Sequence, residues 1–226
     1  MLRRKRWIFA ILALLPVLLV YGWVRIFPIG EILRLSLHKW DLLSRNKPFI
    51  GLDNFRELFQ DTLFQTALAN TAIIAFGVLL VTIPMAMCLA ALIYHRTHAR
   101  FAWFYETSVF IPHVASLVPA AMAWKWIFDA RLGPLNALLG VFGVEPKAWL
   151  FDPVLSVVAI IVLCSWQALG YAVIIYLVGF KNLPHSLYEA AKLDGATPFQ
   201  AFRFVSVPLL KPITLYVSVV TLVSAF

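Results

Sequence analysis

The chain has 226 residues, of which 62% are hydrophobic and only 13% are charged, and its mean hydropathy is +0.86. A soluble domain of this length carries about a quarter charged residues, so the composition argues against a soluble domain and indicates a membrane protein. The net charge of +8 is explained by basic residues in the loops, and no nucleic-acid partner is expected.

Four apolar segments are long enough to cross a hydrocarbon core of about 30 Å as helices. In chain order they are residues 7–27, 66–94, 104–128 and 154–180. Residues 212–226 begin a fifth span, but a helix of this length extends only about 22 Å, so we expect the chain to be cut inside this span. The expected fold is all-α: a polytopic transmembrane helical bundle that forms one domain over residues 1–226.

The first span follows a basic segment, MLRRKR. A secretory signal peptide also begins with basic residues, but this apolar run is long and no small-residue cleavage site follows it, so we expect a retained anchor. Basic residues beside a first span hold that end of the chain in the cytoplasm. The N-terminus and the loops after the second and fourth spans are therefore expected to be cytoplasmic.

The sequence offers no recognisable catalytic or metal site. Cys88 and Cys164 both lie inside apolar segments and are interpreted as buried side chains, not as a disulfide. The phosphate-binding pattern GxxxxGK[ST], the zinc pattern HExxH and the serine pattern GxSxG do not occur in the sequence. We therefore expect no catalytic residue, no metal, no cofactor and no ATP binding by this chain.

The loop at residues 181–211 has the features of two short, capped helices between two spans. Ser186 and Glu189 fit a capping box at the start of a helix that ends before Gly195, the residue that most easily adopts a left-handed backbone. Thr197 and Gln200 fit a second capping box, with Pro198 at the first helical position. This second helix is expected to run to about Val207, before Pro208.

Helices this short are marginal in water unless they pack on another surface. Ala190 and Ala191 would allow a close approach, and Leu187, Tyr188 and Leu193 supply apolar area. The loop therefore suits insertion into a groove of a partner protein. From these residues alone, an interfacial loop that lies on lipid headgroups is an equally good interpretation.

The segment EAAKLDGATPFQAFRFVSVPLLKP, residues 189–212, resembles the "EAA" signature of ABC importer permeases. The matching residues are Glu189, Ala190, Ala191, Asp194, Gly195 and Pro208. The valines before the proline replace the isoleucine and leucine often seen there, which is a mild departure. Segments 48–61, 68–76, 110–139 and 166–196 are similar to the binding-protein-dependent carbohydrate permeases, which include those for maltose-type oligosaccharides and glycerol 3-phosphate.

This resemblance implies a permease subunit of the bacterial inner membrane that imports a carbohydrate, polyol or sugar phosphate. It also implies the partners: a second permease subunit, two cytoplasmic ATPase subunits, an extracytoplasmic solute-binding protein and the surrounding lipid. In this family the first helix of the EAA loop docks on the ATPase, so Glu189 would contact the ATPase and Gly195 would make the turn. For Glu189, helix capping is the competing role.

Two polar residues lie deep in the third and fourth spans. His113 and Gln167 could face a polar translocation path, and hydrogen bonding between helices is the alternative for each. A permease for peptides, amino acids or other solutes stays open as the alternative solute class. A secondary transporter or a membrane-embedded enzyme would need carboxylates or a nucleophile at membrane depth, which the spans do not offer.

Overall fold

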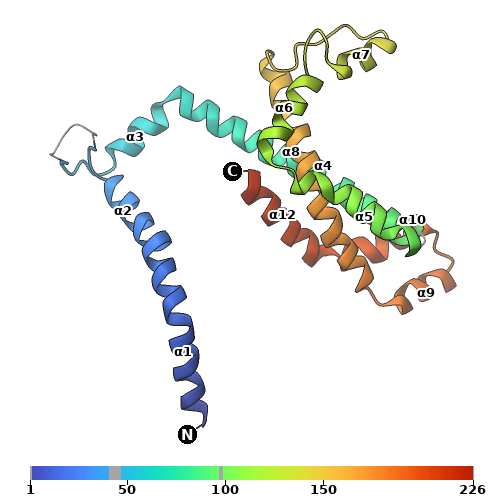
Figure 1. The fold of residues 1–226 in the computed structure, drawn as a ribbon, viewed down its shortest axis with the longest axis horizontal. Helices are drawn as coiled ribbons and strands as arrows, with labels where there is room; N and C mark the ends of the chain where they lie inside the picture. Colours follow the sequence, from blue (N-terminus) through green and yellow to red (C-terminus); the bar gives the residue numbers. More distant parts are fainter. Residues whose placement is uncertain (1, 41–46, 97–98, 226) are drawn as a thin grey trace. The chain divides into compact units, whose positions relative to one another are not determined.

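The computed structural model describes residues 2–40, 47–96 and 99–225, and within these residues the chain is helical apart from turns and one isolated antiparallel bridge, His38 to Phe49. Figure 1 shows the helices in chain order. The chain divides into two compact units, residues 1–68 and 69–226. Each unit is described separately below.

The first unit begins with one long helical segment. Helix α1 (Leu2–Tyr21) continues through a π-helical turn (Gly22–Ile26) into α2 (Phe27–Leu35). The Phe27 N–H donates to the Gly22 carbonyl, and Pro28 follows directly. Since proline has no N–H to donate, a wider turn beside it adjusts the hydrogen-bond ladder. The helix therefore continues eight residues beyond the expected end of the first span at residue 27.

Helix α3 (Asp53–Gln60) and the first residues of the next helix, up to Leu68, complete the first unit. The Asn54 side chain donates to the carbonyls of Ser36 and His38, at 2.7 and 3.0 Å, and so fixes α3 to the end of α2. Helix α4 (Thr62–Arg96) then runs without interruption through Pro84 and covers the predicted second span.

The predicted third span is two helices with a break. Helix α5 (Ala99–Val114) and helix α6 (Leu117–Ile127) meet at an angle of 96° around Ala115 and Ser116. The break falls between Pro112 and Pro119, and prolines are a common cause of helix kinks. Helix α5 packs along α8 in the second unit (Figure 1).

The segment after α6 is organised by one buried side chain. Asn136, in α7 (Pro134–Val141), donates to the carbonyls of Asp129, Ala130 and Lys147. Its amide oxygen accepts from the Lys147 N–H and from the Trp149 indole N–H, at 3.1 and 2.8 Å. The Asn136 amide thereby forms hydrogen bonds with residues before and after α7. These bonds order the segment, which contains no strand.

Helix α8 (Pro153–Lys181) is the central helix of the second unit. Asp152 caps it by accepting from the N–H groups of Val154 and Leu155, at 2.9 and 2.8 Å. Its second half is buried against α4 and α12. The core there contains Ala86, Ala90, Val173, Tyr176, Phe180, Leu210 and Val217.

The last part of the chain contains three short α-helices, a π-helical turn and one longer helix. Helix α9 (His185–Leu193) is followed by α10 (Pro198–Ala201), a π-helical turn (Phe202–Ser206), α11 (Val207–Leu209) and α12 (Lys211–Ala225). The segments Pro198–Leu209 and Lys211–Ser224 meet at an angle of 68°.

Three described helices are long and apolar enough to cross a membrane, and the number rises to five if each of the two bent pairs is one span. The three are residues 11–35, 62–95 and 153–181, and the bent pairs are 101–127 and 198–224. This count rests on length and composition. The all-α bundle that the sequence predicts is confirmed.

Candidate functional site

The EAA segment begins on helix α9, and this helix ends in a fully formed C-terminal cap. The Gly195 N–H donates to the Lys192 carbonyl at 3.1 Å, and the Ala196 N–H donates to the Ala191 carbonyl at 2.9 Å. Gly195 has a φ of +78°. These two bonds and the left-handed glycine define a Schellman motif. The predicted turn at Gly195 is therefore present, and it fixes the direction in which the chain leaves α9.

The predicted capping box at the start of α9 is absent. The helix begins at His185 with Pro184 as its N-cap residue, and no side chain caps it. Ser186 therefore lies inside the first turn, two residues after the N-cap position. Pro184 has an extended backbone and its carbonyl accepts from the Leu187 N–H at 3.2 Å, so the proline starts the helix before Ser186 can do so. Glu189 is consequently not engaged as a cap.

The second capping box is present. The Gln200 N–H donates to the Thr197 hydroxyl at 3.3 Å, and the Thr197 N–H donates to the Gln200 side-chain oxygen at 2.7 Å. The predicted end of this helix before Pro208 is wrong, because α11 continues through Pro208. The π-helical turn just before this proline explains the difference. In this turn the Val207 N–H donates to the Phe202 carbonyl, five residues earlier, and the wider turn lets the helix continue through Pro208.

The side chains of the EAA residues lie mostly at the surface. Glu189, Ala190, Asp194, Gly195 and Pro208 are exposed, and Ala191 is half-buried. Leu193, at the end of α9, is 89% exposed. A short helix with two alanines, an exposed leucine and two exposed carboxylates therefore presents its outer face to solvent or to a partner.

Helix α9 is tied to the rest of the second unit through Tyr188. Its hydroxyl lies 2.8 Å from the Ser206 hydroxyl, and its ring lies edge-on to the ring of His95, at the end of α4, with 5.6 Å between centroids. Burial raises the pKa of Tyr188, so this hydroxyl keeps its proton at neutral pH.

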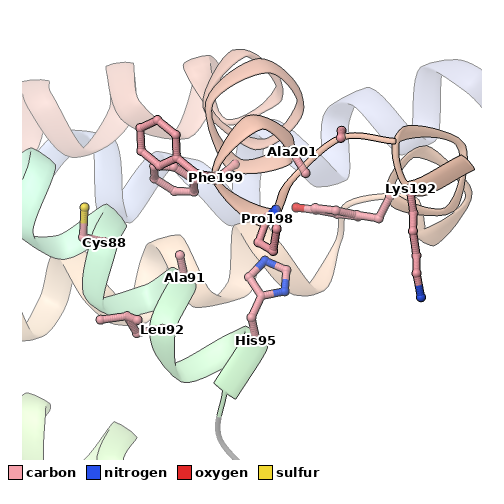
Figure 2. A pocket seen from close by; sticks show the side chains of 11 residues that line it. Cys88, Ala91, Leu92, His95, Lys192, Pro198, Phe199 and Ala201 are labelled. Atoms are coloured by element: carbon pink, nitrogen blue, oxygen red, sulfur yellow. The ribbon is translucent and has the colours of Figure 1, made fainter. Parts of the chain in front are cut away.

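A cavity of about 840 Å³ lies beside Tyr188. Figure 2 shows Cys88, Ala91, Leu92 and His95 on α4 along one side, facing Pro198, Phe199 and Ala201. The lining is mainly apolar, and its basic residues are His95 and Lys192. Helix α4 and the two-helix loop are therefore not closely packed along this side.

The structure brings His113 and Gln167 together at the break between α5 and α6. The His113 Nδ1 atom lies 3.3 Å from the Gln167 carbonyl, and the Gln167 side-chain amide donates to the Ala115 carbonyl at 3.2 Å. The end of a helix leaves carbonyls without intrahelical partners. Gln167 satisfies one of them from α8, so it forms an interhelical hydrogen bond, as the alternative interpretation of this residue expected.

Two tyrosines extend this polar group and were not singled out in the sequence. The Tyr171 ring stacks on His113 at 5.3 Å, and its hydroxyl lies 2.8 Å from that of Tyr216 on α12. Tyr171 follows Gln167 by four residues and so lies on the same face of α8, a spacing that could have indicated it. Gly170 allows the close packing, because a Cβ there would lie 2.5 Å from the Val109 carbonyl oxygen.

The comparisons with known proteins agree with these features. Residues 82–226 match the family described as "Binding-protein-dependent transport system inner membrane component". The chain belongs to this family. The match includes the EAA segment, α8 and α12, and the family is one of transport components, not of catalysts.

This family member is similar to several permeases along nearly its whole length. It is 35% identical to the probable ABC transporter permease protein YurN of Bacillus subtilis, over 97% of this chain and 74% of YurN. It is 34% identical to the lactose transport system permease protein LacF of Rhizobium radiobacter, over 90% of this chain and 68% of LacF. A bacterial alginate ABC transporter, solved in complex with an alginate pentasaccharide-bound periplasmic protein, contains a chain of similar fold. The TM-score is 0.80 at 25% identity, covering 97% of this chain and 72% of that chain.

Proposed function

We propose that this permease imports a carbohydrate or a related polyol or sugar phosphate, delivered by an extracytoplasmic solute-binding protein. The family description includes dependence on a binding protein. LacF is a lactose permease and the structurally similar alginate transporter was solved with a saccharide-loaded periplasmic protein. Both relatives handle sugars, which supports the same solute class for this chain.

The proposal extends to coupling with separate ATPase subunits through α9. One observation carries this proposal: α9 is an exposed helix between the apolar helices α8 and α12. It ends in a Schellman motif, and its Glu189 carboxylate is not used as a helix cap. Such a helix suits a groove on a partner. Two ATPase subunits would bind this permease and a second permease subunit, and their ATP-driven closure would move α9.

His113 and Gln167 are proposed to lie beside the translocation path. Together with Tyr171 and Tyr216 they join α5, α8 and α12 at the broken span. Non-helical backbone at membrane depth is tolerated where it is buried in protein or lines a water-filled cavity. Hydroxyl, amide and imidazole groups match the hydrogen-bonding groups of a sugar.

The orientation proposed here places the N-terminus and the EAA loop in the cytoplasm of a bacterial cell. The basic segment before the first span supports it, because lysine and arginine beside a span stay on the cytoplasmic side. The loop 129–152, which contains α7, would then lie on the outer face of the membrane.

Uptake by the intact transporter tests the solute class. The permease would be reconstituted in proteoliposomes with its partner permease, ATPase and binding protein, and offered labelled lactose, maltose, alginate oligosaccharides, glycerol 3-phosphate, glutamine and a dipeptide. We expect ATP-dependent uptake of at least one saccharide or of glycerol 3-phosphate. Uptake of glutamine or the dipeptide alone would overturn the carbohydrate assignment and leave the family assignment intact.

A further inference from the structure

Tyr188 connects helix α9 to the turn that leads into α12. It precedes Glu189 in the sequence, and its hydroxyl shares a 2.8 Å hydrogen bond with Ser206. Ser206 is fully buried and is the last residue of the π-helical turn Phe202–Ser206. Because Ser206 is fully buried, its hydroxyl cannot exchange this partner freely for water.

From Ser206 a series of backbone hydrogen bonds runs into α12. The Leu210 N–H donates to the Ser206 carbonyl at 2.9 Å, and the Thr214 N–H donates to the Leu210 carbonyl at 2.8 Å. Leu210 is itself buried in the core with Phe180 and Val217. A displacement of Ser206 would therefore move a packed element and not a free loop.

The other connection between α9 and α12 is made by the chain itself. Residues 194–197 join α9 to α10 along the chain, and all of them except the half-buried Ala196 are exposed. The cavity of about 840 Å³ beside Tyr188 separates the two-helix loop from Cys88, Ala91 and Leu92 on α4. This space leaves room for α9 to shift relative to α4, whereas the Tyr188 hydroxyl remains fixed to the π-helical turn.

We propose that Tyr188 is a positioning residue for energy coupling: its hydrogen bond to Ser206 transfers displacement of α9 to the π-helical turn and so to α12. The inference rests on the proposed function of α9 as the ATPase-docking helix. Without this bond, α9 still binds the ATPase through its outer face, but only the exposed 194–197 connection links its movement to α12.

The test uses the intact transporter with spin labels on exposed residues of α8 and α12. Cysteines replace Val178 and Leu215, which are 51% and 67% exposed, in a background without Cys88 and Cys164. The measured quantities are the fraction of molecules whose label distance changes on addition of ATP, and the amount of ATPase that co-purifies. Tyr188→Phe keeps the ring and removes only the hydroxyl, and Ser206→Ala removes the partner.

We expect both variants to retain the ATPase and to lower the ATP-dependent fraction about fivefold, the population change that corresponds to one typical hydrogen bond. The double variant should be no worse than either single variant, because both remove the same interaction. Tyr176→Phe is the matched control: its hydroxyl also donates to an α12 residue, Thr214, at 3.1 Å, but from α8. It should leave the ATP response unchanged.

Three results would overturn the inference. They are a normal ATP response in both single variants, losses that multiply in the double variant, or loss of the ATPase in Tyr188→Phe, which would make Tyr188 part of the docking surface. If instead α9 is not the helix that docks on the ATPase, the result is different, because Glu189→Lys would then retain the ATPase. If Glu189→Lys releases the ATPase and Tyr188→Phe responds normally to ATP, only the role of Tyr188 is wrong.

Discussion

The side-chain amide of Gln167 on α8 donates a hydrogen bond to the carbonyl of Ala115, in the break between α5 and α6, at 3.2 Å. This contact joins the broken span to the central helix of the second unit, next to the contact between His113 and the Gln167 carbonyl. The 96° bend leaves the Ala115 carbonyl without a partner inside a helix, and the Gln167 amide supplies one. In a membrane such a group has no water to replace a lost partner.

Gln167→Met should therefore destabilise the protein. Methionine keeps the length of the side chain and removes the donor, which leaves the Ala115 carbonyl unsatisfied at a cost of about 1–3 kcal/mol. Thermal unfolding in detergent would measure this as a lower midpoint. Ser224→Ala is the control, because the Ser224 hydroxyl donates to the Val220 carbonyl only four residues earlier, at 2.9 Å, and its removal should shift the midpoint little. Equal midpoints for Gln167→Met and wild type would show that the contact carries no stability.

Local hydrogen bonds decided which features of the loop could be predicted from the sequence. The Thr197 and Gln200 box and the left-handed Gly195 depend on residues within five positions of one another, and both are present. The box at Ser186 failed because Pro184 starts the helix first. The end expected before Pro208 failed because a π-helical turn accommodates that proline.

Contacts between distant segments could not be read from one sequence. The sequence marked His113 and Gln167 as polar residues in apolar segments, but their meeting at Ala115 depends on where α5 breaks and on how it packs against α8. The same holds for Tyr188 and Ser206, whose hydrogen bond depends on the path of the chain between α9 and α11.

Gly195 should tolerate asparagine better than valine. Its φ of +78° is strained for any residue with a Cβ, although no atom lies within 4 Å of a Cβ placed there. The cost, about 1 kcal/mol or more for valine, comes from the backbone alone, and asparagine adopts this conformation more readily. We expect Gly195→Val to reduce ATPase co-purification and uptake together, and Gly195→Asn to keep most of both.

The matched control for Gly195 is Gly140→Val in α7. Gly140 also has no atom within 4 Å of its added Cβ, but its φ is not positive. This variant should bind ATPase normally. If Gly195→Val binds ATPase and transports like wild type, the direction of α9 does not matter for coupling.

Glu189 should act through its charge and not through a cap. Because no side chain caps α9 and Glu189 is exposed, Glu189→Gln and Glu189→Lys should change the unfolding free energy by less than about 0.5 kcal/mol. We expect ATPase co-purification to fall in the order wild type, Gln, Lys. Wild-type ATPase binding in both variants would exclude the carboxylate from the docking surface.

Asn136 should be essential for the loop between α6 and α8. Asn136→Ala leaves the Lys147 N–H and the Trp149 indole N–H without their acceptor. Both bonds are only partly buried, so we expect each loss to cost about 1 kcal/mol, the net value of a typical hydrogen bond. We expect faster proteolysis of residues 129–152 in folded protein. An exposed neighbour in the same helix, Leu138→Ala, is the control. Equal cleavage rates for Asn136→Ala and Leu138→Ala would show that the amide network does not order this segment.

The proposed orientation predicts which loops are accessible from outside the cell. Asn182 follows α8 on the proposed cytoplasmic side, and Lys147 lies in the proposed outer loop; both are exposed. Single cysteines at these positions, in a background without Cys88 and Cys164, would be treated with a membrane-impermeant thiol reagent. We expect labelling at position 147 in intact cells, and at position 182 only after the membrane is permeabilised. The reverse pattern would place the EAA loop outside the cell, where no cytoplasmic ATPase could reach Glu189.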